Sequence, residues 1–132
     1  MIDAGRDPII IENLLKIPKG IGKNRVERGG ITHYHYDHTG LLPRIKEMLH
    51  PMVYAYSKEC GSDKTLKNGD TIRLGDSTFK VLRIRGHTED SIGLYCEEHG
   101  AFFSGDAPMQ IRSSKNEYGH EEKFLNTSFS LQ

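Results

Sequence analysis

The chain of 132 residues has no tryptophan, only two cysteines and no apolar run near the ~20 residues that a membrane span requires. Its first five residues lack the basic start and the apolar core of a secretory signal. The cysteines, Cys60 and Cys96, form no C-x-x-C pair, and two isolated thiols fit a reducing compartment better than a disulfide scaffold. We therefore expect a cytoplasmic protein with no membrane partner.

Net charge is also absent, because 18 basic and 18 acidic residues cancel and no segment is strongly basic. Such a chain shows no electrostatic footprint for nucleic acid or for an anionic membrane, so we expect a small-molecule substrate. A chain of this length is typical of one domain and can bury about two thirds of its unfolded surface. The prediction is a single domain over residues 1–132.

Two segments carry helix signals. Asp7 and Pro8 suit the N-cap and the first helical position, and the apolar residues after them form one stripe: Ile9, Ile10, Leu14 and Ile17. Thr39 is placed to cap a second helix, whose apolar residues have amphipathic spacing: Leu41, Leu42, Ile45, Met48 and Leu49. Residues 18–30, rich in glycine and charge, predict a loop.

From residue 52 onward the periodicity changes from helical to extended. Strands are predicted at five places: Met52–Tyr56, Thr71–Leu74, Thr78–Arg85, Ser91–Cys96 and Ala101–Ser104. Helices followed by strands indicate a layered α-plus-β unit. Residues 107–132 are polar, and they predict a poorly structured tail with one short helix around Glu121–Leu125.

The densest chemical signal is the stretch Thr32–Gly40, which holds three histidines and one aspartate within six residues. In an extended chain His33, His35 and Asp37 would lie on one face, because side chains alternate with period two. His38 breaks this alternation. A strand that turns at Asp37 and His38 would direct two ligands at each of two neighbouring points, which is the geometry of a paired-metal site.

Two further candidate ligands follow predicted strands, so that the ligand set is His33, His35, Asp37, His38, His87 and Asp106. Imidazole and carboxylate groups suit zinc, and mixed nitrogen and oxygen sites also suit iron or manganese. Near these ligands, Tyr34 and Tyr36 are expected to pack in the core or at its rim. Arg83 and Arg85 predict a solvated strand face, because they alternate with apolar residues.

At this point the sequence resembles the metallo-β-lactamase fold superfamily. Residues 31–40 match its T-H-x-H-x-D-H signature, residues 86–92 its G-H-T-x-x-S-[IV] element, residues 103–106 its F-x-G-D element and residues 2–5 its I-D-x-G turn. The resemblance implies an α+β fold, the αββα sandwich, in which two sheets pack face to face with helices outside. The metals of this fold lie at one edge, between the sheets.

The resemblance also implies roles for these residues. His33, His35 and His87 would hold a first zinc ion, Asp37 and His38 would hold a second, and Asp106 would bridge the two. Asp3 would support the ligands from behind.

The chain departs from the family pattern at both ends. Members of the family usually have strands before the I-D-x-G turn, and a further histidine ligand well beyond the G-D element. In this chain 26 residues follow Asp106, and His120 is the histidine among them. We therefore expect a chain truncated at both ends, without the N-terminal strands and the C-terminal strand and helix. Pairing with another copy would cover its exposed sheet edges.

The implied function is that of a metal-dependent hydrolase, in which a metal-bridging hydroxide attacks an ester, thioester, lactone, lactam or phosphoester. Asp37 would be the catalytic carboxylate that orients this hydroxide and passes a proton to the leaving group. One alternative is a mononuclear-iron oxygenase that resembles the persulfide dioxygenases and uses His33, His87 and Asp106. The other is a truncated, non-catalytic module that binds metal or pairs with another chain.

Overall fold

The computed structural model describes residues 1–16, 26–107, 109–115 and 121–127, the last two ranges as backbone. The chain begins with a strand-like bridge between Ile2 and Gly30 and then forms three helices and a first sheet. The helices are α1 (Ile9–Lys16), α2 (Tyr36–Thr39) and α3 (Leu42–Leu49). The sheet contains β1 (Arg28–Gly30), β2 (Met52–Ala55) and β3 (Lys64–Thr65), parallel and in that order.

A second, antiparallel sheet follows in the order β4-β5-β6-β7. Its strands are β4 (Thr71–Leu74), β5 (Ser77–Arg83), β6 (Ile92–Cys96) and β7 (Ala101–Phe103). Each strand pairs with the next one in sequence, in the manner of a meander. The predicted strands are confirmed here with shifts of one or two residues at their ends.

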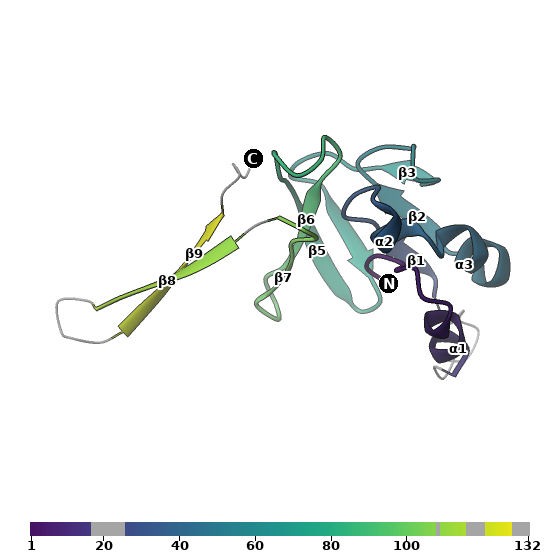
Figure 1. The fold of residues 1–132 in the computed structure, drawn as a ribbon, viewed down its shortest axis with the longest axis horizontal. Coiled ribbons are helices and arrows are strands. Elements are labelled where there is room, and N and C mark those ends of the chain that lie inside the picture. The colour runs from purple at the N-terminus through teal and green to yellow at the C-terminus, as the bar shows by residue number, and fades with distance from the viewer. Residues whose placement is uncertain (17–25, 108, 116–120, 128–132) are drawn as a thin grey trace.

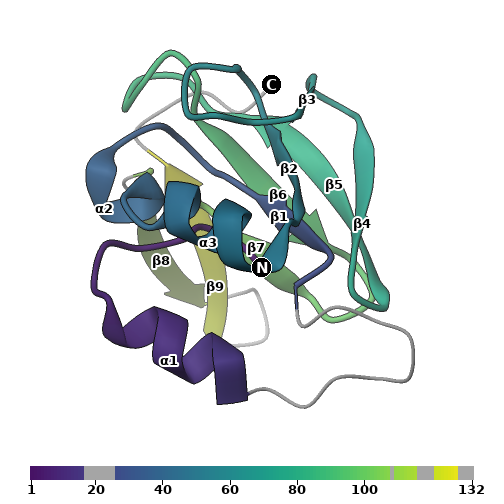
Figure 2. The ribbon, with the colours of Figure 1, turned by 90° about the vertical axis from the view of Figure 1, so that its right-hand side faces the viewer.

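The two faces of β2 show how the layers are stacked. Val53 and Ala55 are buried against α1 and α3, whereas Tyr54 between them packs on the core of the second sheet. The first sheet is therefore covered by helices on one face and by the second sheet on the other. Figure 2 shows α3 in front of β1 and β2, with the strands of the second sheet behind them.

Two apolar clusters fill the spaces between these layers. The cluster between helices and first sheet contains Ala4, Ile11, Ile31, Leu41, Leu42, Ile45, Val53 and Ala55. The cluster between the sheets contains Leu66, Ile72, Leu74, Phe79, Val81, Ile92, Leu94 and Cys96. Full burial of one large aliphatic side chain is worth about 1.5–3 kcal/mol, so these clusters fix the layers on which the site is built. The α+β fold with two packed sheets is confirmed.

Two helix predictions need correction. In α1, Ile11 is the buried residue and Ile9 is half exposed, so the buried face is rotated about the helix axis from the predicted one. Ile17 lies outside the described residues. Thr39 does not cap α3, because Leu41 occupies that position and the Thr39 hydroxyl donates to the carbonyls of Tyr34 and His35. Thr39 instead closes the preceding turn.

Two backbone predictions are also wrong. Part of the predicted loop at 18–30 is β1, which pairs in parallel with β2. This strand has no alternation of apolar side chains, because its buried residues are the glycines Gly29 and Gly30. Gly30 has room for no side chain, since an added Cβ would lie 2.9 Å from Leu94. The histidine motif is not an extended strand. An irregular segment, residues 31–35, follows β1, and α2 begins at Tyr36.

The last described elements are β8 (Met109–Lys115) and β9 (Glu121–Thr127), which form an antiparallel pair. The short helix predicted at Glu121–Leu125 is therefore wrong; ladder hydrogen bonds with β8 override the local sequence preference. Figure 1 shows this pair extending away from the two sheets. The longest described helices have eight residues, and none of the described helices could cross a membrane.

Candidate metal centre

Three strand ends bring the predicted ligands together. The chain leaves β1 at Gly30 and carries His33 and His35 to the start of α2, where Asp37 and His38 follow. The loop between β5 and β6 supplies His87, and the turn after β7 supplies Asp106. These segments are far apart in sequence, and the parallel and antiparallel pairings of the two sheets place them at one edge.

His33 is held by a short hydrogen-bond chain in the core. The Thr32 backbone N–H and hydroxyl donate to the two carboxylate oxygens of Asp3, at 2.7 and 2.8 Å. Because that hydroxyl is already a donor, its oxygen accepts from Nδ1 of His33, at 3.0 Å. The resulting tautomer leaves a lone pair on Nε2 of His33. This atom is buried and has no hydrogen-bond partner among the described residues.

A buried, unpartnered acceptor costs free energy unless something binds it. His33 has an exposed fraction of 1%, and its Nε2 lies 3.5 Å from Oδ2 of Asp106, which is beyond a good hydrogen bond. Burial, the largest cause, lowers the pKa of His33, so the imidazole is neutral near pH 7. A neutral imidazole nitrogen and a carboxylate oxygen that face each other both offer lone pairs. A metal cation between them would bind both.

His38 shows the same arrangement from the other side of Asp3. Its Nδ1 lies 2.7 Å from Oδ2 of Asp3, so this nitrogen carries the proton and donates it. Its Nε2 then faces two carboxylates, Oδ1 of Asp106 at 3.2 Å and Oδ2 of Asp37 at 3.6 Å. Burial lowers the pKa of His38, but the hydrogen bond and charge of Asp3, with the charges of Asp106 and Asp37, outweigh it and raise this pKa.

His35 and His87 complete the arrangement. Nε2 of His87 lies 3.2 Å from Nδ1 of His35 and 3.6 Å from Oδ2 of Asp106. Their rings meet nearly at right angles, as do the rings of His33 and His87. Nε2 of His33 and Nε2 of His87 therefore both face Oδ2 of Asp106, and Nδ1 of His35 lies beside Nε2 of His87.

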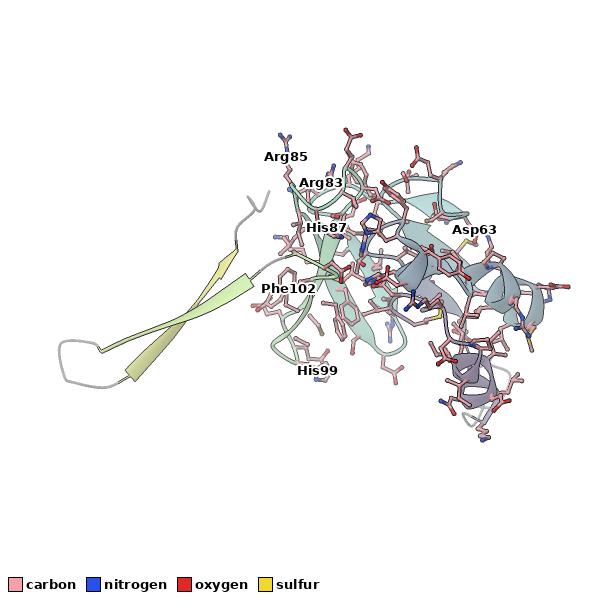
Figure 3. The ribbon with its side chains drawn as sticks, in the orientation of Figure 1. Asp63, Arg83, Arg85, His87, His99 and Phe102 are labelled. Carbon is pink, nitrogen blue, oxygen red and sulfur yellow. The ribbon has the colours of Figure 1, made fainter. Side chains whose placement is uncertain are left out.

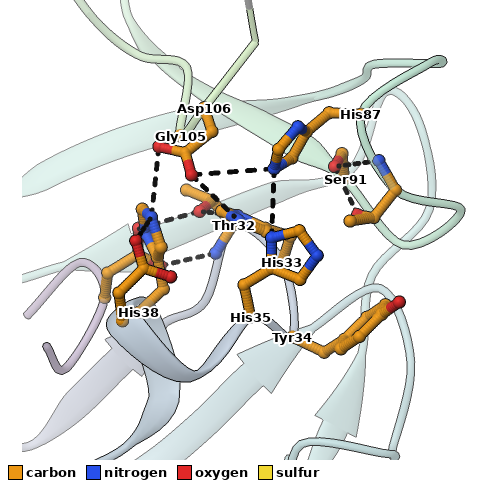
Figure 4. Close-up of polar contacts among 12 residues, drawn as sticks. Thr32, His33, Tyr34, His35, His38, His87, Ser91, Gly105 and Asp106 are labelled. Carbon is orange, nitrogen blue, oxygen red and sulfur yellow. Dashed lines mark hydrogen bonds and ion pairs between the residues drawn. The ribbon is translucent and has the colours of Figure 1, made fainter. Parts of the chain in front are cut away.

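Asp106 is shared by two ligand groups, as Figure 4 shows: it lies between His38 on one side and His87 on the other. The close approach depends on Gly105, whose φ is +61° and whose added Cβ would lie 2.7 Å from the Thr32 hydroxyl. The first group contains His33, His35, His87 and Asp106, and the second contains Asp37, His38 and Asp106. Within each group the potential ligand atoms lie within 4.8 Å of one another.

The donor chemistry of both groups fits divalent metal ions. Each group offers imidazole and carboxylate ligands. In His33 and His38 the ring nitrogen that faces away from the site is hydrogen-bonded to an oxygen, as is usual in metal-binding histidines. The structure thus gathers all six predicted site residues, and Asp3 lies behind the ligands as expected. His120, the further candidate ligand, lies outside the described residues.

Tyr34 and Tyr36 have exposed fractions of 47% and 68%, so of the two placements predicted for them the core is excluded and the rim is left. The prediction for Arg83 is wrong. Arg83 does not lie on a plain solvated face. Its guanidinium donates to the carbonyls of Ile84, Ser91 and Glu89 and lies 4.0 Å from the centre of the Tyr56 ring.

Thr32 and Tyr56 also contact residues in or beside the site, although the sequence pattern predicts no role for them. Thr32 lies inside the histidine motif, and its position before His33 is the signal that could have identified it as a tautomer-setting hydroxyl. Tyr56 carries no comparable signal, because Arg83, whose guanidinium it contacts, is distant in sequence. The side chain of Arg83 fastens the loop that carries His87, since its acceptors lie on both arms of that loop.

Known proteins resemble the chain over most of its described length. No model of a protein family matches it. A hydroxyacylglutathione hydrolase from Erythrobacter litoralis is 32% identical over 99 residues, which are 73% of this chain and 39% of that protein. An atrochrysone carboxyl ACP thioesterase from Aspergillus fumigatus is 33% identical over 87 residues, which are 64% of this chain and 20% of that protein.

Among solved structures, the BLEG-1 B3 metallo-β-lactamase superposes with a TM-score of 0.66 at 24% identity, over 83% of this chain and 61% of that one. The hydroxyacylglutathione hydrolases that match are covered over only about a third of their length, from 33% to 40% in four of them. The chain belongs to the metallo-β-lactamase fold superfamily.

Proposed function

We propose that this chain carries the metal centre of a hydrolase that cleaves thioesters. The observation that supports it most is the convergence of six ligand side chains into two groups that share Asp106. A single-metal site would not require the second group. The names of the related proteins support a thioester substrate, because they include a hydroxyacylglutathione hydrolase and an ACP thioesterase.

In this proposal His33, His35 and His87 would hold one ion and Asp37 and His38 would hold another, while Asp106 belongs to both ligand groups. Zinc is the expected metal, because it accepts imidazole and carboxylate ligands, and iron and manganese are the alternatives. When bound, such an ion lowers the pKa of a coordinated water toward neutrality and polarises a substrate carbonyl.

The protein supplies orientation and proton transfer. The Asp37 side chain is 53% exposed and its Oδ2 lies 3.6 Å from His38, so one carboxylate oxygen faces the site while the group stays open to substrate. With its other oxygen, Asp37 can hold a water in position, take a proton from it as it attacks the carbonyl, and pass that proton to the departing thiolate. Asp3 keeps His38 in the tautomer whose Nε2 faces the site.

Metal analysis and activity test this proposal together. The protein is loaded with zinc, iron(II) or manganese(II) in turn, freed of loose metal and measured by elemental analysis. Hydrolysis of a simple acyl thioester is then followed by the release of free thiol. About two zinc ions per chain with thioester hydrolysis would support the proposal. Two ions without hydrolysis of the thioester would contradict it.

The same measurements address the two alternatives. About one iron per chain, with oxygen uptake in the presence of a persulfide, would favour the mononuclear oxygenase. Absence of bound metal and of activity, together with a stable dimer in light scattering, would favour a non-catalytic pairing module. The alternatives therefore differ in stoichiometry before any substrate is identified.

A further inference from the structure

A pocket of about 690 Å³ borders the metal centre at His87, and its other lining residues lie outside the two ligand groups. Its lining includes Tyr56, Lys67, Asn68, Arg83, Arg85 and His87. Pockets of roughly 300–1,000 Å³ hold small organic ligands. Figure 3 shows Arg85, Arg83 and His87 one below another along the same edge of the molecule. We call this the cationic pocket.

The charge of Arg83 is held in place but not neutralised. Its guanidinium donates to three backbone carbonyls, including Ser91 at 2.8 Å, and it stacks on the Tyr56 ring. Carbonyl oxygens and an aromatic face offer only partial negative charge. Within the described residues neither Arg83 nor Lys67 forms an ion pair with a carboxylate. The pocket thus keeps positive potential on a rigid wall.

A smaller neighbouring cavity of about 260 Å³ has the opposite character. It shares Tyr56 and Glu89 with the cationic pocket, and it adds Glu59 and Asp90 but no lysine or arginine. Glu89 is the one carboxylate that the cationic pocket includes, against three basic side chains. An anion beside His87 is therefore attracted to one cavity and repelled by the other.

We propose that the cationic pocket binds the anionic end of the substrate, a carboxylate placed several bonds from the carbonyl that is cleaved. This inference rests on the proposed function, because only that proposal makes the bound anion a substrate. His87 belongs both to the first ligand group and to the pocket lining, so a ligand whose carbonyl lies at the metal centre can extend past His87 into the pocket. The pocket would select acyl thioesters with an acidic thiol or acyl part over neutral ones.

Direct binding tests the pocket without any reaction. The probes are 3-(ethylthio)propanoate and its neutral amide, thioethers that cannot be hydrolysed, added to the metal-loaded, ¹⁵N-labelled chain. We expect the acid to shift the backbone amide signals of Lys67, Asn68 and Arg85, and the amide to leave them in place. The variant Lys67→Glu should lose these shifts, and the matched variant Lys80→Glu, an exposed lysine outside the pocket, should keep them.

Kinetics give the second readout, with S-acetyl-3-mercaptopropanoate and its amide as substrates. Lys67→Glu should raise KM for the acid about tenfold and change KM for the amide less than about twofold. Lys80→Glu should change neither. Equal effects on both substrates, or shifts caused equally by both thioethers, would overturn the cationic pocket. If neither thioester is hydrolysed, the proposed function fails, and the binding experiment still decides the pocket.

Discussion

The two ligand groups of the metal centre differ in almost every physical respect, although they share Asp106. The first group is anchored in the core by His33, which has an exposed fraction of 1%, and it combines three segments of the chain. The second group takes its other two ligands from the short helix α2, and the Asp37 side chain is 53% exposed. One group is built into the fold, and the other opens to solvent.

This difference predicts an order of metal binding. The nitrogens of the first group are already directed at one point before any ion arrives, so little conformational entropy is lost on binding. In the second group Asp37 must lose the freedom of an exposed side chain. We therefore expect the first group to bind metal more tightly and the second to exchange it more readily. The open group is also the one that a substrate can approach.

The largest effect should come from His87→Ala, which removes a ligand of the first group. We expect the metal affinity of the first group to fall by more than about a hundredfold. Loss of a residue that only hydrogen-bonds a metal ligand already costs about 10- to 100-fold in affinity. Competition with a chelator measures the change. The matched control is His99→Ala, because His99 is exposed on the turn beyond β6 and should alter nothing. Unchanged metal uptake in His87→Ala would exclude it as a ligand.

The next largest effect should come from Asp37→Ala, and it should be confined to the second group. We expect the stoichiometry to fall from about two ions to about one, with the remaining ion as tightly bound as before, and hydrolysis to be strongly reduced. Asp76→Ala, in the exposed turn between β4 and β5, is the control. Loss of both ions in Asp37→Ala would show that the groups fill together, against the proposed order.

The sequence was sufficient for the parts of the site that depend on local pattern. His33, His35, Asp37 and His38 are close in sequence, and their density alone indicated metal. His87 was found because it interrupts an apolar strand. Alternation along a strand places Asp37 on the same face as His33 and His35, whereas the predicted turn at Asp37 and His38 separates them. In the structure this turn is the start of α2, and Asp37 and His38 lie in the second group.

What the sequence could not supply were contacts set by packing between distant segments. β1 has no apolar pattern, and only its pairing with β2 makes it a strand. Arg83 reads like any basic residue on a strand until the loop 84–91 folds back over it. β9 pairs with β8 where local composition favoured a helix. Each of these features is decided by neighbours in space rather than by neighbours in sequence.

A smaller effect is expected from Asp3→Asn, which tests how the groups are coupled. Asp3 accepts from Thr32 and from His38, and the asparagine amide can replace only one carboxylate oxygen. Asparagine tolerates the positive φ of 54° at this position, so the backbone should be preserved. We expect the second ion to bind about 10- to 100-fold more weakly, and the first ion to change less. Equal weakening of both ions in a chelator titration would mean that Thr32 transmits the change to His33.

The smallest effect should come from Asp63→Asn, which changes stability outside the metal centre. Asp63 accepts from the Val53 backbone N–H at 2.8 Å and from the Lys46 ammonium at 3.0 Å, and these two contacts, the backbone one first, lower its pKa. Since a lowered carboxyl pKa stabilises the fold only while the group is ionised, the contribution is present above the ordinary value of 3.8 and is lost as the pH falls through the lower, folded value. The side chain is 37% exposed, so solvent screening limits the loss at neutral pH to about 1 kcal/mol or less. Urea unfolding of both proteins should show this difference at pH 7 and a shrinking one at acid pH. Metal stoichiometry should not change at pH 7. A change would mean that the difference in metal binding between the two groups depends on the stability of the whole fold and not on the geometry of each group.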